Sequence, residues 1–218
     1  MENTVGNPTG IYVGDQGFLT VNADQINIMT KGIEGGNSLT NAIQVNDAEG
    51  YGPSLTINGN VNISMSGGLG GNGIATQIHD RFGEYSFGSG GTASIDLHGN
   101  LKIAGKDSGT WGIPLNRENV FSRYNNAGIL AHTSTSMVNV YGDVDMTVYG
   151  NGVTAGGAGE SASVVITGGG KIRVPAGTNY GYYALAAYNG SISMNLGSDA
   201  KTPGTHDVQL DGDLFGSY

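Results

Sequence analysis

One short pattern occurs three times along this chain and constrains its fold more than any other feature. The copies are Ser54–Ile63, Ser94–Ile103 and Met137–Met146, and each joins two runs of alternating apolar and polar residues through Gly-Asn or Gly-Asp. Alternation with a period of two places successive side chains on opposite faces of a β-strand. Glycine at the joint permits the backbone to bend. Repetition every few tens of residues is typical of a stacked fold, so we expect a β-solenoid.

Weaker copies extend the pattern toward both ends of the chain. They are Phe18–Ile28, Ser163–Val174 and Val208–Leu214. The joints of all the copies then fall at positions 23, 59, 99, 142, 169 and 212. This unequal spacing indicates turns of the solenoid that differ in loop length, and it argues against a strict tandem array.

A second strand-like element precedes most copies, often after glycine. These elements are Gly10–Val13, Asn41–Val45, Gly73–Ile78, Gly128–Ala131 and Tyr182–Ala186. One turn would then hold about three short strands, which is the cross-section of a parallel β-helix. We predict that residues at the same place in each repeat form inward columns, namely Val61, Ile63, Leu101, Ile103, Val144 and Met146.

Composition and charge exclude several classes of protein. The chain has 40 glycines among 218 residues and only 12% charged residues, and its strands are rich in Val, Ile, Leu, Thr and Tyr, which argues against a disordered chain. No stretch has a sustained helical period, so we expect little helix. We therefore expect one all-β domain over residues 1–218. The sequence contains no cysteine and no apolar run long enough for a membrane helix. We expect no secretory leader at this end, since Met1–Thr4 is polar and lacks a basic and an apolar region. A net charge of −9 disfavours nucleic acid and anionic membrane surfaces as partners.

These features together resemble the passenger domain of bacterial type V secreted proteins, the classical autotransporters of pertactin-like or diffuse-adherence-adhesin-like type. The resemblance spans residues 10–214. It depends on the Gly-Asn and Gly-Asp joints, on Gly-Ile at 10–11, 73–74 and 128–129, and on the cysteine-free composition rich in Gly, Asn, Ser and Thr. It implies a right-handed parallel β-helix exposed on an outer-membrane surface, with roles in adhesion, aggregation or biofilm formation. Such passengers are followed by a translocator barrel, which this sequence does not contain.

No cofactor or metal motif stands out among the residues that could carry chemistry. The histidines His79, His98, His132 and His206 form no pair at a metal-ligand spacing. Lys106–Gly109 resembles the Gly-Asp-Ser-Gly of chymotrypsin-like serine proteases, but lysine replaces the leading glycine. Because a nucleophilic serine also needs a base and an orienting acid, we interpret this segment as a turn. We expect no cofactor and no catalytic residue.

Paired aspartates leave two other chemistries open. Asp143 and Asp145 lie two residues apart, Asp96 is expected beside them one turn away, and Asp211 and Asp213 repeat the spacing. Two carboxyl groups about 5–10 Å apart are the requirement for glycoside hydrolysis, and a row of carboxylates suits calcium. Aspartate beside glycine is also ordinary turn chemistry, and we favour that interpretation.

Two long insertions, at about 79–92 and 104–127, interrupt the pattern and are the most unusual part of the sequence. Loops that project from a rigid scaffold commonly bind ligands, and aromatic residues with arginine are favoured at contact centres. The predicted ligand-binding residues are Trp111, Arg117, Phe121, Arg123 and Tyr124. The alternative is that these rings pack a small satellite core onto the flank of the helix. A tyrosine cluster at 180–188 is a second candidate, in which packing is favoured further.

The sequence thus predicts a single-domain, right-handed parallel β-helix (β-solenoid) with loop insertions. We expect a secreted bacterial adhesin or surface scaffold, exposed at the outer membrane, that binds without catalysis. Its expected partners are surface proteins or glycans of host or bacterial cells, or a second copy of the chain. Nucleic acid and direct membrane insertion are not expected. Two alternatives stay open, a polysaccharide lyase or glycosidase on the same fold and a structural stalk without a ligand.

Overall fold

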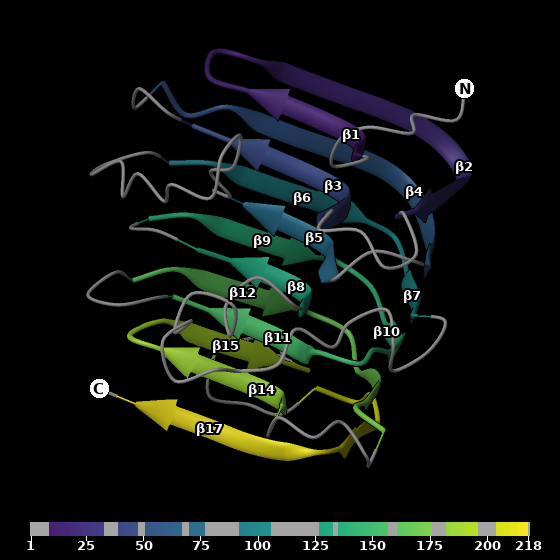
Figure 1. Ribbon diagram of the computed structural model, residues 1–218, viewed down its shortest axis with the longest axis vertical. Coiled ribbons are helices and arrows are strands. Elements are labelled where there is room, and N and C mark those ends of the chain that lie inside the picture. The colour runs from purple at the N-terminus through teal and green to yellow at the C-terminus, as the bar shows by residue number, and fades with distance from the viewer. Residues whose placement is uncertain are drawn as a thin grey trace.

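The chain folds into a parallel β-helix, in which successive turns stack along one axis (Figure 1). The structure is a computed structural model. It describes residues 9–32, 39–47, 51–66, 70–76, 92–105, 127–132, 135–156, 161–175, 182–195 and 204–217. All strand pairs in this part of the chain are parallel, as the sequence pattern predicts.

One face of the helix is a seven-stranded sheet, called sheet A here. Its strands in spatial order are β1 (Thr9–Gly14), β3 (Leu39–Asn46), β5 (Gly70–Thr76), β8 (Ala127–Ala131), β11 (Asn151–Ala155), β14 (Tyr183–Tyr188) and β17 (Asp213–Ser217). Five of the seven correspond to the elements that the sequence predicts before each copy of the repeat. Strand β11 was missed, and β17 was assigned to the last copy of the repeat.

The remaining strands form a ten-stranded sheet, sheet B, that bends at the glycine joints. On one side of the bend lie the first half of β2 (Phe18–Lys31), the first half of β4 (Ser54–Ser66), β6 (Ser94–His98), β9 (Met137–Val140), β12 (Ser163–Ile166) and β15 (Ser191–Met194). On the other side lie the second halves of β2 and β4, then β7 (Leu101–Gly105), β10 (Val144–Thr147), β13 (Gly170–Arg173) and β16 (Val208–Asp211). One turn, or rung, therefore holds three strand segments, one from sheet A and two from sheet B.

The register confirms the predicted inward columns. Val61 pairs with Leu101 and Leu101 with Val144, while Ile63 pairs with Ile103 and Ile103 with Met146. All six side chains are at most 2% exposed and belong to one continuous core. Burial of apolar surface contributes about 25 cal/mol per Å², so these columns stabilise the stack of rungs.

The joint glycines are required because successive rungs approach each other closely at the bend. A Cβ atom added at Gly99 would collide with the carbonyl oxygen of Gly59, and one at Gly142 with that of Gly99. Gly59 also has a φ of +148°, which side chains rarely adopt. The first joint, at position 23, has no glycine, and there β2 carries an irregularity between Asn22 and Gln25.

A second column of small residues explains the Gly-Ile openings of sheet A. A Cβ atom at Gly73 would lie 2.7 Å from the Ile103 side chain, and one at Gly128 would lie 3.0 Å from the sulfur of Met146. The small residue thus leaves room for a large side chain from sheet B. The following isoleucines, Ile74 and Ile129, are fully buried in the core.

Two predicted joints are wrong. Val208 pairs with Gly170, so Val208–Asp211 follows the last bend, and Gly212 lies before β17 of sheet A. The sequence at 208–214 resembles a copy of the repeat because Gly-Asp also occurs at the corner between β16 of sheet B and β17 of sheet A. The fifth joint glycine is Gly168 and not Gly169, since a Cβ at Gly168 would meet the carbonyl oxygen of Gly142.

The outward side of the middle strands of sheet A is buried as well. Ala75, Ala127 and Leu130 form a small apolar cluster that is separate from the main core, and each is 0% exposed. The outer strands of sheet A are more exposed, since Tyr12 of β1 is 58% exposed and Leu214 of β17 is 64% exposed.

Candidate functional site: a polar groove on sheet B

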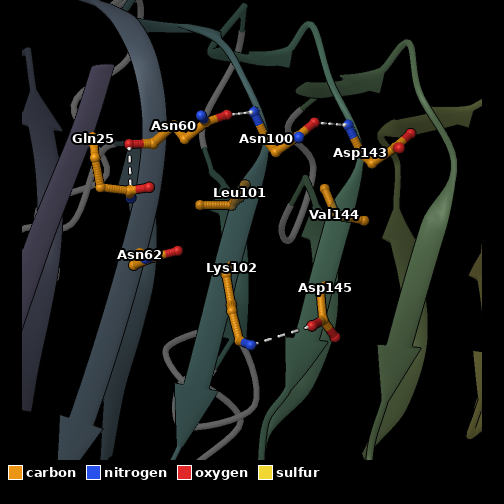
Figure 2. Close-up of a pocket in the computed structure, with 9 residues that line it drawn as sticks. All are labelled: Gln25, Asn60, Asn62, Asn100, Leu101, Lys102, Asp143, Val144 and Asp145. Atoms are coloured by element: carbon orange, nitrogen blue, oxygen red, sulfur yellow. Dashed lines mark hydrogen bonds and ion pairs between the residues drawn. The ribbon is translucent and has the colours of Figure 1, made fainter. Parts of the chain in front are cut away.

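A row of side chains after the joint glycines links the rungs of sheet B. The backbone N–H of Asn100 donates to Asn60 Oδ1 at 2.9 Å, and the N–H of Asp143 donates to Asn100 Oδ1 at 2.9 Å. The N–H of Gly169 donates to Asp143 Oδ1, also at 2.9 Å. We call Asn60, Asn100 and Asp143 the exposed ladder. Figure 2 shows the three side chains in a row across neighbouring strands.

The exposed ladder forms one wall of a shallow groove of about 380 Å³ that crosses β2, β4, β7 and β10. The second polar row lies two residues further along each strand, where Asn62 pairs with Lys102 and Lys102 with Asp145. The complete lining is Gln25, Asn60, Asn62, Asn100, Leu101, Lys102, Asp143, Val144 and Asp145. Leu101 and Val144 are buried in the core, so the side chains offered to a ligand are polar.

Contacts between rungs hold most of these polar side chains in place. Lys102 Nζ lies 3.6 Å from Asp145 Oδ2, and both side chains are about 60% exposed. Gln25 Nε2 donates to the carbonyl oxygen of Asn60 at 3.3 Å, and Asn62 Nδ2 donates to Asn27 Oδ1 at 3.1 Å. The groove therefore presents amide, ammonium and carboxylate groups on a rigid backbone.

The structure separates the aspartates that the sequence analysis placed together. Asp96 lies on β6, before the bend, where it accepts a hydrogen bond of 2.8 Å from Asn139 Nδ2. It pairs with Thr56 and Asn139 and with neither Asp143 nor Asp145, so the predicted neighbourhood is wrong. The cause is the joint, which sends residues 96 and 143 to different sides of the bend.

The other predicted aspartate pair is divided in the same way. Asp211 ends β16 in sheet B, where its Oδ2 lies 3.4 Å from Arg173 Nε, and Asp213 begins β17 in sheet A. Asp143 and Asp145 share the groove, but Asp143 Oδ1 is engaged by Gly169 N–H and by His206 Nδ1 at 2.9 Å. Each of these carboxylates except Asp213 thus has a partner on another rung or in the last turn.

The described histidines are dispersed. His98 stacks on Tyr141 of the next rung with a centroid distance of 4.5 Å and an angle of 2° between the rings. His206 contacts Asp143, and half-buried His132 donates its backbone N–H to Thr76 Oγ1 at 3.3 Å. His79 lies outside the described residues. In the described ranges, no three His, Cys, Asp or Glu side chains come together as a metal site.

A buried carboxylate outside the groove has a structural role. Asp47 is 2% exposed and accepts three backbone hydrogen bonds of 2.9–3.0 Å, from Tyr51 and Gly52 in its own turn and from Thr92 in the next. It therefore ties the start of one sheet B strand to the start of its neighbour. Nothing in the sequence pattern singled out this residue.

The predicted ligand-binding residues Trp111, Arg117, Phe121, Arg123 and Tyr124 lie outside the described residues, as do most of the two insertions. Strand β7 extends to Gly105 and β8 begins at Ala127, so the second insertion starts slightly later than predicted. In the tyrosine cluster, Tyr182 is buried while Tyr183 and Tyr188 are half-buried, and Tyr180 is outside the described residues. The packing interpretation of the cluster fits these burials.

One pattern in the sequence does correspond to the groove. The joints at Gly59, Gly99 and Gly142 are each followed by Asn or Asp and, two residues later, by a second polar residue, as in Asn60 and Asn62 or Asp143 and Asp145. Such residues alternate with the inward column and must face outward. Their lateral neighbours depend on the register between rungs, which the sequence gives only where the copies align well.

Comparisons with protein-family models, curated proteins and solved structures give no match. Within the described part of the chain, no helix has the length and apolarity required to cross a membrane. The interpretation of the groove therefore depends on its own geometry.

Proposed function

We propose that this chain is an extracellular adhesive or scaffold module of a secreted bacterial protein, which binds surface ligands without covalent chemistry. The acidic, cysteine-free composition and the resemblance to autotransporter passengers support this proposal. The parallel β-helix supports it as well, because a stack of rungs offers a long and rigid surface.

The observation that carries the proposal is the polar groove on sheet B. Its amide, lysine and aspartate groups come from four neighbouring rungs, and contacts between rungs orient several of them before any ligand arrives. Side chains that are already ordered lose little conformational entropy on binding. A groove of this kind favours reversible recognition of a polar surface molecule.

The carboxylates favour binding over bond cleavage. A hydrolase of the glycosidase type needs an acid and a second carboxylate directed at one substrate bond. Here Asp143 is engaged by Gly169 and His206, and Asp145 lies beside Lys102. Both aspartates serve contacts within the fold.

The proposal is tested by coating beads with the 218-residue chain and measuring their adhesion to bacterial and epithelial cells. Two variants locate the contact surface: the double change Asn62→Ala with Lys102→Ala in the groove, and Trp111→Ala with Arg123→Ala in the second insertion. We expect adhesion by the unmodified chain and loss in at least one folded variant. Absence of adhesion by the unmodified chain would support the stalk interpretation. Release of reducing ends from polysaccharides, abolished by Asp143→Ala, would establish the enzyme interpretation instead.

A further inference from the structure

We propose that the groove on sheet B binds an uncharged, linear glycan whose chain runs along the axis of the β-helix. This inference rests on the proposed function, since it names the ligand class of the same site. It depends on three features of the groove, namely its direction, its hydrogen-bonding groups and its charge.

The direction of the groove follows from the register. Gln25, Asn62, Lys102 and Asp145 come from successive strands β2, β4, β7 and β10, so the groove crosses the strands and runs along the stacking axis. Neighbouring strands are about 4.8 Å apart, so the three spacings give a length of about 14 Å, enough for roughly three pyranose rings. An extended β-1,4-linked glycan also advances by about one strand spacing per ring, so successive rings would meet equivalent positions on successive rungs.

The hydrogen-bonding groups suit hydroxyl groups. In the exposed ladder the Oδ1 atoms of Asn60 and Asn100 are used between rungs, which leaves the amide NH2 group of Asn100 with no partner in the described ranges. In the second row, Asn62 donates through Nδ2 and no described residue donates to its Oδ1. Asn100 thus offers a donor in the first row, and Asn62 offers an acceptor in the second. A sugar hydroxyl is both donor and acceptor and can satisfy the two rows together.

The charge disfavours an acidic glycan. Two aspartates and one lysine line the groove, and the whole chain carries a net charge of −9. Lys102 is the only cation in the lining and is already paired with Asp145. A uronic acid or sulfated sugar would meet like charge at Asp143 and Asp145 without an unpaired cation to offset it.

The affinity for one short glycan should be low. The nine lining residues include no aromatic ring, and the groove is shallow. Sugar binding without a stacking platform depends on hydrogen bonds exchanged with water, so we expect a Kd on the order of 1 mM for a tetrasaccharide.

The experiment is a titration of the ¹⁵N-labelled 218-residue chain followed by NMR. The uncharged probes are cellotetraose, tetra-N-acetylchitotetraose and mannotetraose, and the acidic probe of equal length is tetragalacturonate. We expect at least one uncharged probe to shift amide signals of residues 60–62, 100–102 and 143–145, with tetragalacturonate at least tenfold weaker. Asn62→Ala with Lys102→Ala should weaken that binding at least tenfold. Lys171→Ala is the matched control. Lys171 is the register partner of Asp145 on the next strand, β13, and it does not line the groove.

Two results would overturn the inference. One is equal or tighter binding of tetragalacturonate at the groove, which would refute the charge argument. The other is that none of the three uncharged probes shifts the groove signals in the folded chain. If beads coated with the chain still adhere to cells in that case, the proposed function stands and its contact surface lies elsewhere. If adhesion is absent as well, both proposals fail.

Discussion

Two rows of asparagine side chains accept the same type of hydrogen bond, from a backbone N–H of the next rung, but one row is exposed to solvent and the other is buried. In the exposed ladder, Asn60 and Asn100 each accept the backbone N–H of the next rung at 2.9 Å. In sheet A, Asn41 accepts the N–H of Asn72 at 3.1 Å and Asn72 accepts that of Ala127 at 3.0 Å. Asn41 and Asn72 are 4% and 1% exposed, so we call this second row the buried ladder.

The difference between the ladders lies in what replaces a lost hydrogen bond. Water can reach the N–H groups of the exposed ladder, whereas the N–H of Ala127 is buried with Asn72 Oδ1 as its acceptor. An unsatisfied buried donor costs its full desolvation penalty. The buried ladder is therefore a feature of stability, and the exposed ladder is free to contribute side chains to a binding surface.

The largest effect should come from the residue next to the exposed ladder. Leu101 follows Asn100 directly but faces the core and is 1% exposed. We expect Leu101→Asp to lower the free energy of unfolding by more than about 4 kcal/mol, because it places a charge in an apolar column. Thermal melting followed by circular dichroism measures the loss. An unchanged melting temperature would show that the alignment of the rungs is wrong.

The next effect is predicted in the buried ladder. Asn72→Ala removes the acceptor of the Ala127 N–H and the donor to Asn41 Oδ1 at 3.0 Å. The expected cost is about 2–4 kcal/mol. Asn27→Ala is the control, since Asn27 also bonds across rungs, to Asn62, but is exposed. Chemical denaturation of both variants should give a clearly larger loss for Asn72→Ala, and equal losses would contradict the role of burial.

The close approach of the rungs at the bend predicts an intermediate cost. Gly99→Ala would drive a methyl group against the carbonyl oxygen of Gly59, so the rungs must separate locally. Overpacking of this kind costs about 1–3 kcal/mol. Gly216→Ala is a matched control, because a Cβ there meets no atom within 4 Å. If the two variants melt at the same temperature, the stacking at the joint is looser than the structure shows.

Most of the fold could be predicted because inward positions repeat. The alternation around Ile57, Leu97 and Val140 marks the same face of each rung, and the register agrees. Strand β11 was not predicted because it has only one large apolar residue, Val153, among small and polar neighbours. The joint at Gly212 was misplaced because local sequence does not distinguish one glycine corner of a rung from another.

The candidate site was harder to predict than the core. Outward residues such as Asn62 and Lys102 occupy the same place in two copies of the repeat, but they differ in residue type, so the sequence does not mark them as parts of one site. Their contact follows from a register that spans 40 residues, as the bond from Asn100 to Asn60 illustrates. Asp96 is the opposite case. The sequence predicts the bend correctly, but the bend separates Asp96 from Asp143 and Asp145, which the sequence analysis had placed beside it.

A smaller effect is expected when the exposed ladder is broken. Asn100→Ala removes the acceptor of the Asp143 N–H, but water can take its place. The expected cost is about 1 kcal/mol, well below that of Asn72→Ala. Melting of the two variants side by side makes the comparison direct, and a cost for Asn100→Ala that matched Asn72→Ala would remove the distinction between the ladders.

The smallest effect should be that of Asp143→Asn. The other members of the exposed ladder are asparagines, so a carboxamide at this position can still accept the Gly169 N–H through Oδ1. The change removes one exposed negative charge and weakens the contact with His206, which is an exposed pair and contributes little. We therefore expect a change in stability below about 0.5 kcal/mol, against about 1 kcal/mol for Asp143→Ala, which also loses the Gly169 bond. A loss of stability for Asp143→Asn as large as that for Asp143→Ala would mean that the charge holds the ladder together.

Bead adhesion should survive Asp143→Asn on the binding interpretation, whereas an enzyme that uses this carboxylate would lose its turnover.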